Sequence, residues 1–143
     1  MKKYKVGYTQ GVFDMFHIGH LNLINQAKNY CEYLIAGVNS DNLVLEYKKK
    51  LPVIPENDRT EIVKNIKAVD QCLIVNTLDK LVLQEELHFD AIFIGDDWKG
   101  HPRWEQTQKD LGKQGIDVVF LPHTPNVSST LFRAVNTNRI KEE

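Results

Sequence analysis

Residues 11–20 read Gly-Val-Phe-Asp-Met-Phe-His-Ile-Gly-His, and they lie between a strand-like segment and an amphipathic helical pattern. His17 and His20 are three positions apart, and Gly19 lies between them. A helix N-terminus presents backbone N–H groups and the positive end of the helix dipole, which together favour a phosphate. Glycine at this point allows a ligand to approach the backbone closely. We interpret the stretch as a strand-to-helix turn that binds phosphate.

Two other interpretations of the histidine pair stay open. His17 and His20 could pack in the core, or they could be two ligands of a metal ion, because histidines at this spacing can chelate. The sequence places no third ligand beside them. We favour phosphate contact because of the helix terminus.

Apolar runs alternate with helical patterns along the chain, which is typical of βα units that feed one parallel sheet. Crossovers between parallel strands are right-handed, so five units predict a doubly wound α/β sheet in the order 3-2-1-4-5. Ligands bind such sheets at the carboxyl ends of strands one and four, where the winding reverses. The predicted strands are Tyr4–Gln10, Tyr33–Asn39, Gln71–Val75, Ala91–Gly95 and Asp117–Leu121, and a last helix is predicted from Ser128.

The connection Ser40–Glu56 has no obvious periodicity and carries Lys48-Lys49-Lys50. A connection of this length inside a compact domain tends to be functional or disordered. A charge run is usually a solvated face, and that alternative stays open. The functional interpretation is that one or two of these lysines neutralise a polyphosphate.

Arg59 opens the next predicted helix, for which Asn57 or Asp58 is the expected cap. A guanidinium in this position can bind phosphate through two parallel hydrogen bonds. The alternative is an ion pair on the helix surface with Asp58 or Glu61.

Two further polar segments fall on the predicted crevice. Gly95-Asp96-Asp97-Trp98 follows the fourth strand, where two carboxylates need partners. They can bond a ribose, a base or a polyol, or hold magnesium through water, whereas the alternative is a turn that caps the next helix. His123–Thr130 follows the fifth strand, and its Ser128-Ser129-Thr130 can cap the last helix or contact a triphosphate.

The composition bounds the class of protein. A length of 143 residues fits one domain, here 1–143, and the net charge of −1 is unlike the positive field of a nucleic-acid-binding protein. No apolar run reaches the length of a membrane span, and Met1–Lys5 does not resemble a secretion signal. We expect a cytoplasmic protein without nucleic-acid or membrane partners, in which Cys31 and Cys72 are small buried residues.

These motifs resemble the small bacterial cytidylyltransferases of the HxGH nucleotidyltransferase superfamily, most nearly the glycerol 3-phosphate branch. Residues 11–14 match the GTFD segment of that family and residues 17–20 match HxGH. The lysine run, Arg59, the Asp-Asp-Trp segment and residues 128–130 recur in the order of the family, over nearly the whole chain. The resemblance implies a Rossmann-like nucleotidyltransferase fold and a homodimer.

The resemblance also implies a reaction and a set of roles. A phosphomonoester, most nearly glycerol 3-phosphate, attacks the α-phosphorus of CTP with Mg²⁺ present, and CDP-glycerol for teichoic-acid-like or capsular polymers is formed with pyrophosphate. No residue of the chain is assigned as a metal ligand. The implied catalytic residues are His17, His20 and Lys50; the implied nucleotide-binding residues are Gly11, Val12, Phe13, Arg59, Asp96, His123, Thr124, Ser128, Ser129 and Thr130; the implied acceptor-binding residues are Lys48, Lys80, Asp97 and Trp98.

The chain departs from the family pattern at a few positions. Val12 replaces a threonine, Lys67 and His123 replace arginines, and Asn126 replaces a glycine. Lysine and histidine do not reproduce a bidentate guanidinium contact, so the nucleotide or acceptor preference can differ. The alternatives are another alditol or amino-alcohol phosphate as acceptor, adenylyl transfer, and a nucleotide-binding module without catalysis.

Overall fold

The computed structural model describes residues 2–125, and five of its strands form one parallel sheet. The order is β3-β2-β1-β4-β5, so β1 and β4 are neighbours at the point where the winding reverses. This doubly wound, Rossmann-like arrangement confirms the predicted topology. The strands are β1 (Tyr4–Gly11), β2 (Cys31–Asn39), β3 (Gln71–Val75), β4 (Ala91–Gly95) and β5 (Asp117–Leu121).

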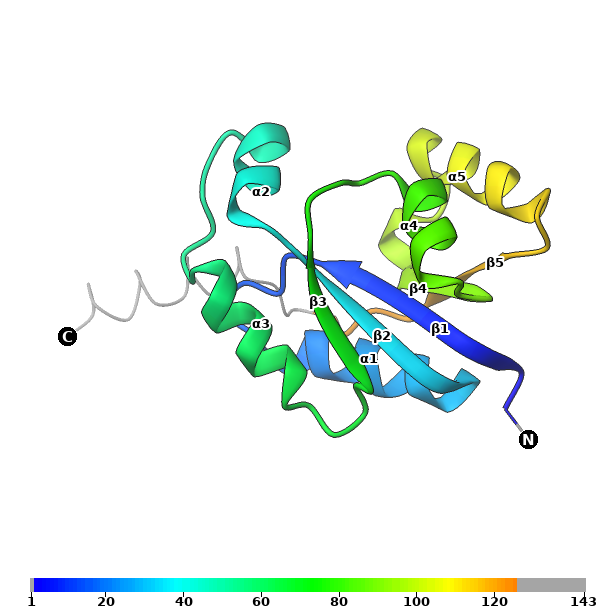
Figure 1. Cartoon of the computed structure of the whole chain (residues 1–143), viewed down its shortest axis with the longest axis horizontal. Coiled ribbons are helices and arrows are strands. Elements are labelled where there is room, and N and C mark those ends of the chain that lie inside the picture. The colour runs from blue at the N-terminus through cyan, green and yellow to red at the C-terminus, as the bar shows by residue number, and fades with distance from the viewer. Residues whose placement is uncertain (1, 126–143) are drawn as a thin grey trace.

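Helices cover both faces of the sheet (Figure 1). One buried cluster joins the sheet to α1 and α3, and a second joins it to α4 and α5. The predicted helix from Ser128 lies outside the described residues. The helices are α1 (Ile18–Tyr30), α2 (Asp41–Lys48), α3 (Glu56–Lys64), α4 (Lys80–Leu87) and α5 (Pro102–Gly112), and a 3₁₀ turn, η1, spans Asp96–Trp98.

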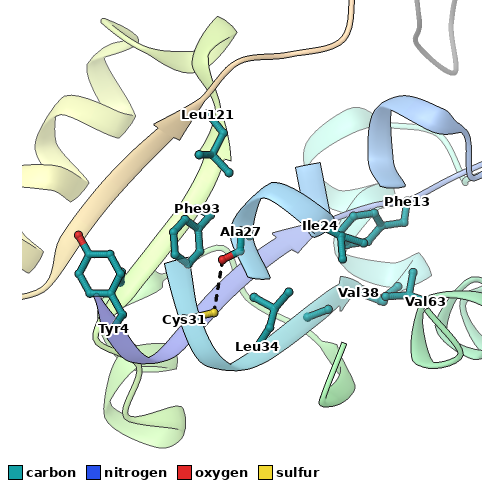
Figure 2. Packing of buried hydrophobic residues seen from close by; sticks show 12 residues of the cluster. Tyr4, Phe13, Ile24, Ala27, Cys31, Leu34, Val38, Val63, Phe93 and Leu121 are labelled. Atoms are coloured by element: carbon teal, nitrogen blue, oxygen red, sulfur yellow. Dashed lines mark hydrogen bonds between the residues drawn. The ribbon is translucent and has the colours of Figure 1, made fainter. Parts of the chain in front are cut away.

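The first cluster includes Tyr4 of β1 and Phe13 of the turn that follows this strand (Figure 2). Phe13 is 4% exposed and belongs to the same buried cluster as Ile24 of α1. Cys31 begins β2, is buried, and bonds the carbonyl of Ala27 through its thiol at 3.4 Å. Cys72 is only half-buried, and both thiols are free. Within residues 2–125, no helix is long and apolar enough to cross a membrane.

The connection after β2 differs from the prediction because it contains α2. Ser40 caps this helix by accepting a hydrogen bond from the backbone N–H of Leu43 at 3.1 Å. Leu43 and Val44 are buried, and this short apolar pair with its serine cap was the signal for a helix.

The predicted cap of α3 was wrong as well. The helix begins at Glu56 after Pro55, with no side-chain cap from Asn57 or Asp58. Instead, the N–H of Glu56 donates to a carboxylate oxygen of Asp41 at 3.3 Å. A residue of α2 therefore supplies the acceptor that local sequence was expected to supply.

Gly7 tests how tightly the first cluster is packed. A Cβ at this position would lie 2.5 Å from the ring of Phe93 and 2.7 Å from the sulfur of Cys31. We expect Gly7→Ala to lower the free energy of unfolding by about 1–3 kcal/mol, because the core must shift. Gly112→Ala is the control, since a Cβ there meets nothing within 4 Å. Urea unfolding measures both, and equal stability of the two variants would contradict the packing.

Candidate active site

The turn between β1 and α1 has an unusual backbone. Phe13 and Met15 both have positive φ angles, 53° and 48°, which non-glycine residues rarely adopt. Such conformations persist where the surroundings impose them, and they are concentrated at functional sites. The buried ring of Phe13 lies edge-on to the imidazole of His20, with 5.5 Å between ring centroids. The ring of Phe13 therefore packs against the imidazole of His20.

His17 and His20 form a reciprocal cap at the start of α1. The Nδ1 atom of His17 accepts from the N–H of Gly19 at 3.1 Å, and Nδ1 of His20 accepts from the N–H of His17 at 3.2 Å. The two rings are stacked, with centroids 3.8 Å apart. An Nδ1 that accepts carries no proton, so each neutral ring holds its proton on Nε2.

The surroundings keep both rings neutral. Burial lowers the pKa of His17, and burial together with the neighbouring His17 lowers the pKa of His20 to about 4. At neutral pH the pair therefore offers two N–H donors without carrying charge. This arrangement suits hydrogen bonds to phosphate oxygens at the helix N-terminus.

Asp14 connects this turn to the segment that follows α2. Its buried carboxylate accepts from the N–H groups of Val53 and Ile54, at 2.8 and 2.9 Å. Sequence reasoning did not assign it a role. The contact holds the lysine-bearing segment against the turn.

Arg59 of α3 contacts the turn and is 1% exposed. Its Nη1 donates to the carbonyls of Val12 and Asn39 at 2.7 and 2.8 Å, and its Nε donates to the carbonyl of Ile54 at 2.8 Å. Its Nη2 pairs with Asp41 at 2.7 Å. The structure thus corrects two expectations: the guanidinium is committed to protein acceptors instead of a bidentate phosphate contact, and its ion pair is neither with Asp58 nor with Glu61.

The three lysines lie at the end of α2. Lys48 is its last residue, with its ammonium 5.9 Å from the ring centroid of Tyr47, and Lys49 adopts a left-handed conformation that ends the helix. All three are exposed. The segment leaves the carboxyl end of β2, which is the edge of the sheet that carries the histidine turn, and Asp14 secures it there.

The loops after β4 and β5 meet at the same edge. Asp96 and His123 are 2.6 Å apart between Oδ1 and Nδ1. The hydrogen bond from His123 lowers the pKa of Asp96, and the same bond raises the pKa of His123. Thr124 accepts at 2.9 Å from the side chain of Asn22, an α1 residue that sequence reasoning missed. These contacts tie the loop after β5 to the histidine helix, whereas Ser128, Ser129 and Thr130 lie outside the described residues.

A second group of side chains lies where α4 and α5 begin. Lys80 lies over the ring of Trp104 at 5.3 Å from its centroid, and burial lowers the pKa of this lysine to about 8. The guanidinium of Arg103 lies 5.8 Å from the ring centroid of Trp98. Asp97 and Trp98 are exposed. The structure therefore brings Lys80 and Trp98 to neighbouring elements and adds Arg103, which the sequence analysis did not single out.

Known proteins are similar to this chain in sequence and in fold. The sequence profile of the cytidylyltransferase-like family matches residues 8–135. The chain belongs to the cytidylyltransferase-like family. It is similar to a glycerol-3-phosphate cytidylyltransferase of Bacillus spizizenii, with 34% identity over 85% of this chain and 89% of the relative. These matches identify the protein as a nucleotidyltransferase.

Other members of this group carry different names. An FAD synthase of Thermococcus onnurineus is 33% identical over 79% of this chain and 76% of its own length. The solved structure of a lipopolysaccharide core biosynthesis protein from Thermoplasma volcanium aligns with a TM-score of 0.70 and 26% identity, covering 85% of this chain and 97% of that one. These relatives thus resemble the chain in family and fold, whereas their names point to different substrates.

The histidine cap predicts a particular titration. In ¹⁵N-detected NMR, His17 and His20 should carry their protons on Nε2, and His20 should stay neutral until about pH 4. The unfolded state binds a proton near pH 6.5, so the free energy of unfolding should fall as the pH drops from 6.5 towards 4. His123 should titrate above its ordinary range in the same spectra. Protons on Nδ1, or an ordinary pKa for His20, would contradict the cap.

The buried guanidinium predicts a large effect on stability. Arg59→Met should lower the free energy of unfolding by about 3 kcal/mol or more, because buried carbonyls and Asp41 lose their partner. Lys64→Met, on the exposed part of the same helix, should change it by less than about 0.5 kcal/mol. Chemical denaturation followed by circular dichroism compares the two. Similar losses in both variants would exclude a special role for Arg59.

Proposed function

We propose that the protein transfers the cytidylyl group of CTP to glycerol 3-phosphate, which forms CDP-glycerol and pyrophosphate. The observation that carries this proposal is the pair of imidazoles that cap α1 through Nδ1, next to the carboxyl ends of the neighbouring strands β1 and β4. The similarity to glycerol-3-phosphate cytidylyltransferases, at 34% and 31% identity over most of the chain, supports the choice of nucleotide and acceptor.

The proposed step is a direct displacement. A phosphoryl oxygen of the acceptor forms a bond to the α-phosphorus of CTP, and the bond from that phosphorus to the bridging oxygen breaks, with pyrophosphate leaving. Charge accumulates on the phosphate oxygens in the transition state, where fixed donors act most strongly. The Nε2–H groups of His17 and His20 supply two such donors, and no covalent nucleophile takes part.

The remaining roles follow the resemblance and the geometry. Lys50 supplies positive charge to CTP, and the backbone of Gly11, Val12 and Phe13 lies against the α-phosphate. The nucleotide is also contacted by Asp96, His123 and Thr124, from the loops that follow β4 and β5. The resemblance adds Ser128, Ser129 and Thr130 to this set. Lys48, Lys80, Asp97 and Trp98 receive the acceptor. Arg59 acts as a positioning residue, because it holds the turn and the lysine segment in one unit.

Magnesium is proposed to arrive with the triphosphate. Mg²⁺ prefers phosphate oxygens, water and one or two carboxylates, so the triphosphate of CTP can supply most of its ligands. When bound, the ion neutralises phosphate charge. A homodimer, as the resemblance implies, is part of the same proposal.

Adenylyl transfer is the second candidate. It is favoured by the 33% identity to the FAD synthase of Thermococcus onnurineus. The same pair of imidazole donors serves any nucleoside triphosphate, so replacing CTP by ATP in the assay separates the two candidates.

Pyrophosphate release tests the proposal. The protein with CTP, Mg²⁺ and glycerol 3-phosphate should release pyrophosphate, and His17→Asn should lower kcat about 100-fold or more while CTP affinity changes little. Asparagine keeps an N-cap acceptor, so the helix stays capped and only the Nε2 donor is lost. Absence of turnover with every alditol and amino-alcohol phosphate, or full activity in His17→Asn, would overturn the proposal.

A further inference from the structure

The ring of each tryptophan of the chain lies against a cation, and these contacts join η1, α4 and the start of α5. Arg103 covers the ring of Trp98, and Lys80 of α4 covers the ring of Trp104, at 5.8 and 5.3 Å from the ring centroids. The chain has no other tryptophan. Two cations on adjacent helices therefore lie close to the loop that follows β4.

This group lies at the edge of the proposed crevice. Gln10, near the end of β1, donates to the carbonyl of Thr77 at 3.1 Å, which fixes the loop that leads into α4. Trp98 ends the 3₁₀ turn η1, which directly follows β4. Both cations therefore lie near the carboxyl ends of β1 and β4, on the face of the sheet that α4 and α5 cover.

Neither cation is neutralised within the described part of the chain. Lys80 donates to the carbonyl of Leu78 at 2.8 Å, and neither it nor Arg103 makes an ion pair among residues 2–125. The nearby carboxylate of Asp79 instead caps α4, accepting from two N–H groups. Burial and the charge of Arg103 lower the pKa of Lys80, and the charge of Asp79 opposes them with a smaller effect. Two like charges that make no ion pair within residues 2–125 favour an anion between them.

We propose that Arg103 acts with Lys80 to hold the phosphoryl group of the acceptor, and that this pair selects a polyol phosphate over a quaternary-ammonium alcohol phosphate. The proposal rests on the proposed function and adds a specificity-determining residue to it. Two donors on the phosphoryl oxygens that do not attack leave the third oxygen for the α-phosphorus.

The same pair disfavours a cationic acceptor. Quaternary ammonium groups are bound over aromatic faces, and here Arg103 and Lys80 already lie over both indole rings. A third positive charge would meet two uncompensated ones. A neutral polyol avoids this repulsion, and the exposed carboxylate of Asp97 can accept from its hydroxyl groups.

Tryptophan fluorescence tests the proposal directly, since both emitters belong to the cluster. Glycerol 3-phosphate should give a saturable change in emission, measured with and without an α,β-methylene analogue of CTP. Arg103→Ala should weaken the apparent affinity at least tenfold, and Arg103→Lys, which keeps the charge, should restore part of it. Lys109→Ala, an exposed change in the last turn of α5, should match the wild type.

The outcomes separate this inference from the proposed function. Choline phosphate should give no saturable response in the wild type. No response to glycerol 3-phosphate, equal affinities in wild type and Arg103→Ala, or equal responses to both esters would overturn the inference, even if CTP is turned over. A response that depends on Arg103, without pyrophosphate release from any acceptor, would support the subsite and reject cytidylyl transfer. Arg103→Gln serves in place of Arg103→Ala if that variant does not fold.

In the steady state, Arg103→Ala should raise the KM for glycerol 3-phosphate at least tenfold and leave the KM for CTP nearly unchanged. A merely structural role would move both constants, so an equal change in the two KM values would contradict the assignment.

Discussion

Each imidazole of the His17–His20 pair caps α1 through its Nδ1 atom, and this contact determines the protonation of its Nε2 atom. Because Nδ1 accepts from the backbone in both rings, the proton lies on Nε2 and the rings stay neutral. Their orientation is then set by the helix terminus itself, before any ligand is present. Fixed donors of this kind require little reorganisation when charge develops on a phosphate, and that makes them effective in catalysis.

The second requirement is that the lysine segment stays close to these rings. A loop with three exposed lysines would ordinarily move independently of the sheet. Here the carboxylate of Asp14 accepts hydrogen bonds from the backbone of this segment. Arg59 in turn donates to the carbonyl of Ile54 in the segment and to the carbonyl of Val12 in the turn. The ion pair of the buried Arg59 with the half-buried Asp41 adds α2 to the same unit. The turn that carries the two histidines, the lysine segment and α2 are therefore connected by hydrogen bonds and one ion pair.

Sequence patterns predicted the sheet well because buried parallel strands appear as continuous apolar runs, and handed crossovers restrict their order. They placed the start of β2 two residues late, since pairing of Tyr4 with Cys31 extends the ladder beyond the apolar run. The partners of Arg59 could not be predicted, because Asp41 is 18 residues away and approaches only in the folded chain. The protonated nitrogen of each histidine likewise depends on a backbone contact that no motif encodes. Arg103 was not predicted as a site residue, because only the folded chain brings it close to Lys80, which lies on another helix.

The proposed role of the two histidines depends on where the triphosphate lies. A crystal structure of the protein with CTP measures this directly. We expect phosphate oxygens within hydrogen-bond distance of Nε2 of both His17 and His20, at the carboxyl ends of β1 and β4, with both Nδ1 atoms still bonded to the backbone. Phosphates bound at the opposite edge of the sheet, or rings that turn away from them, would contradict it.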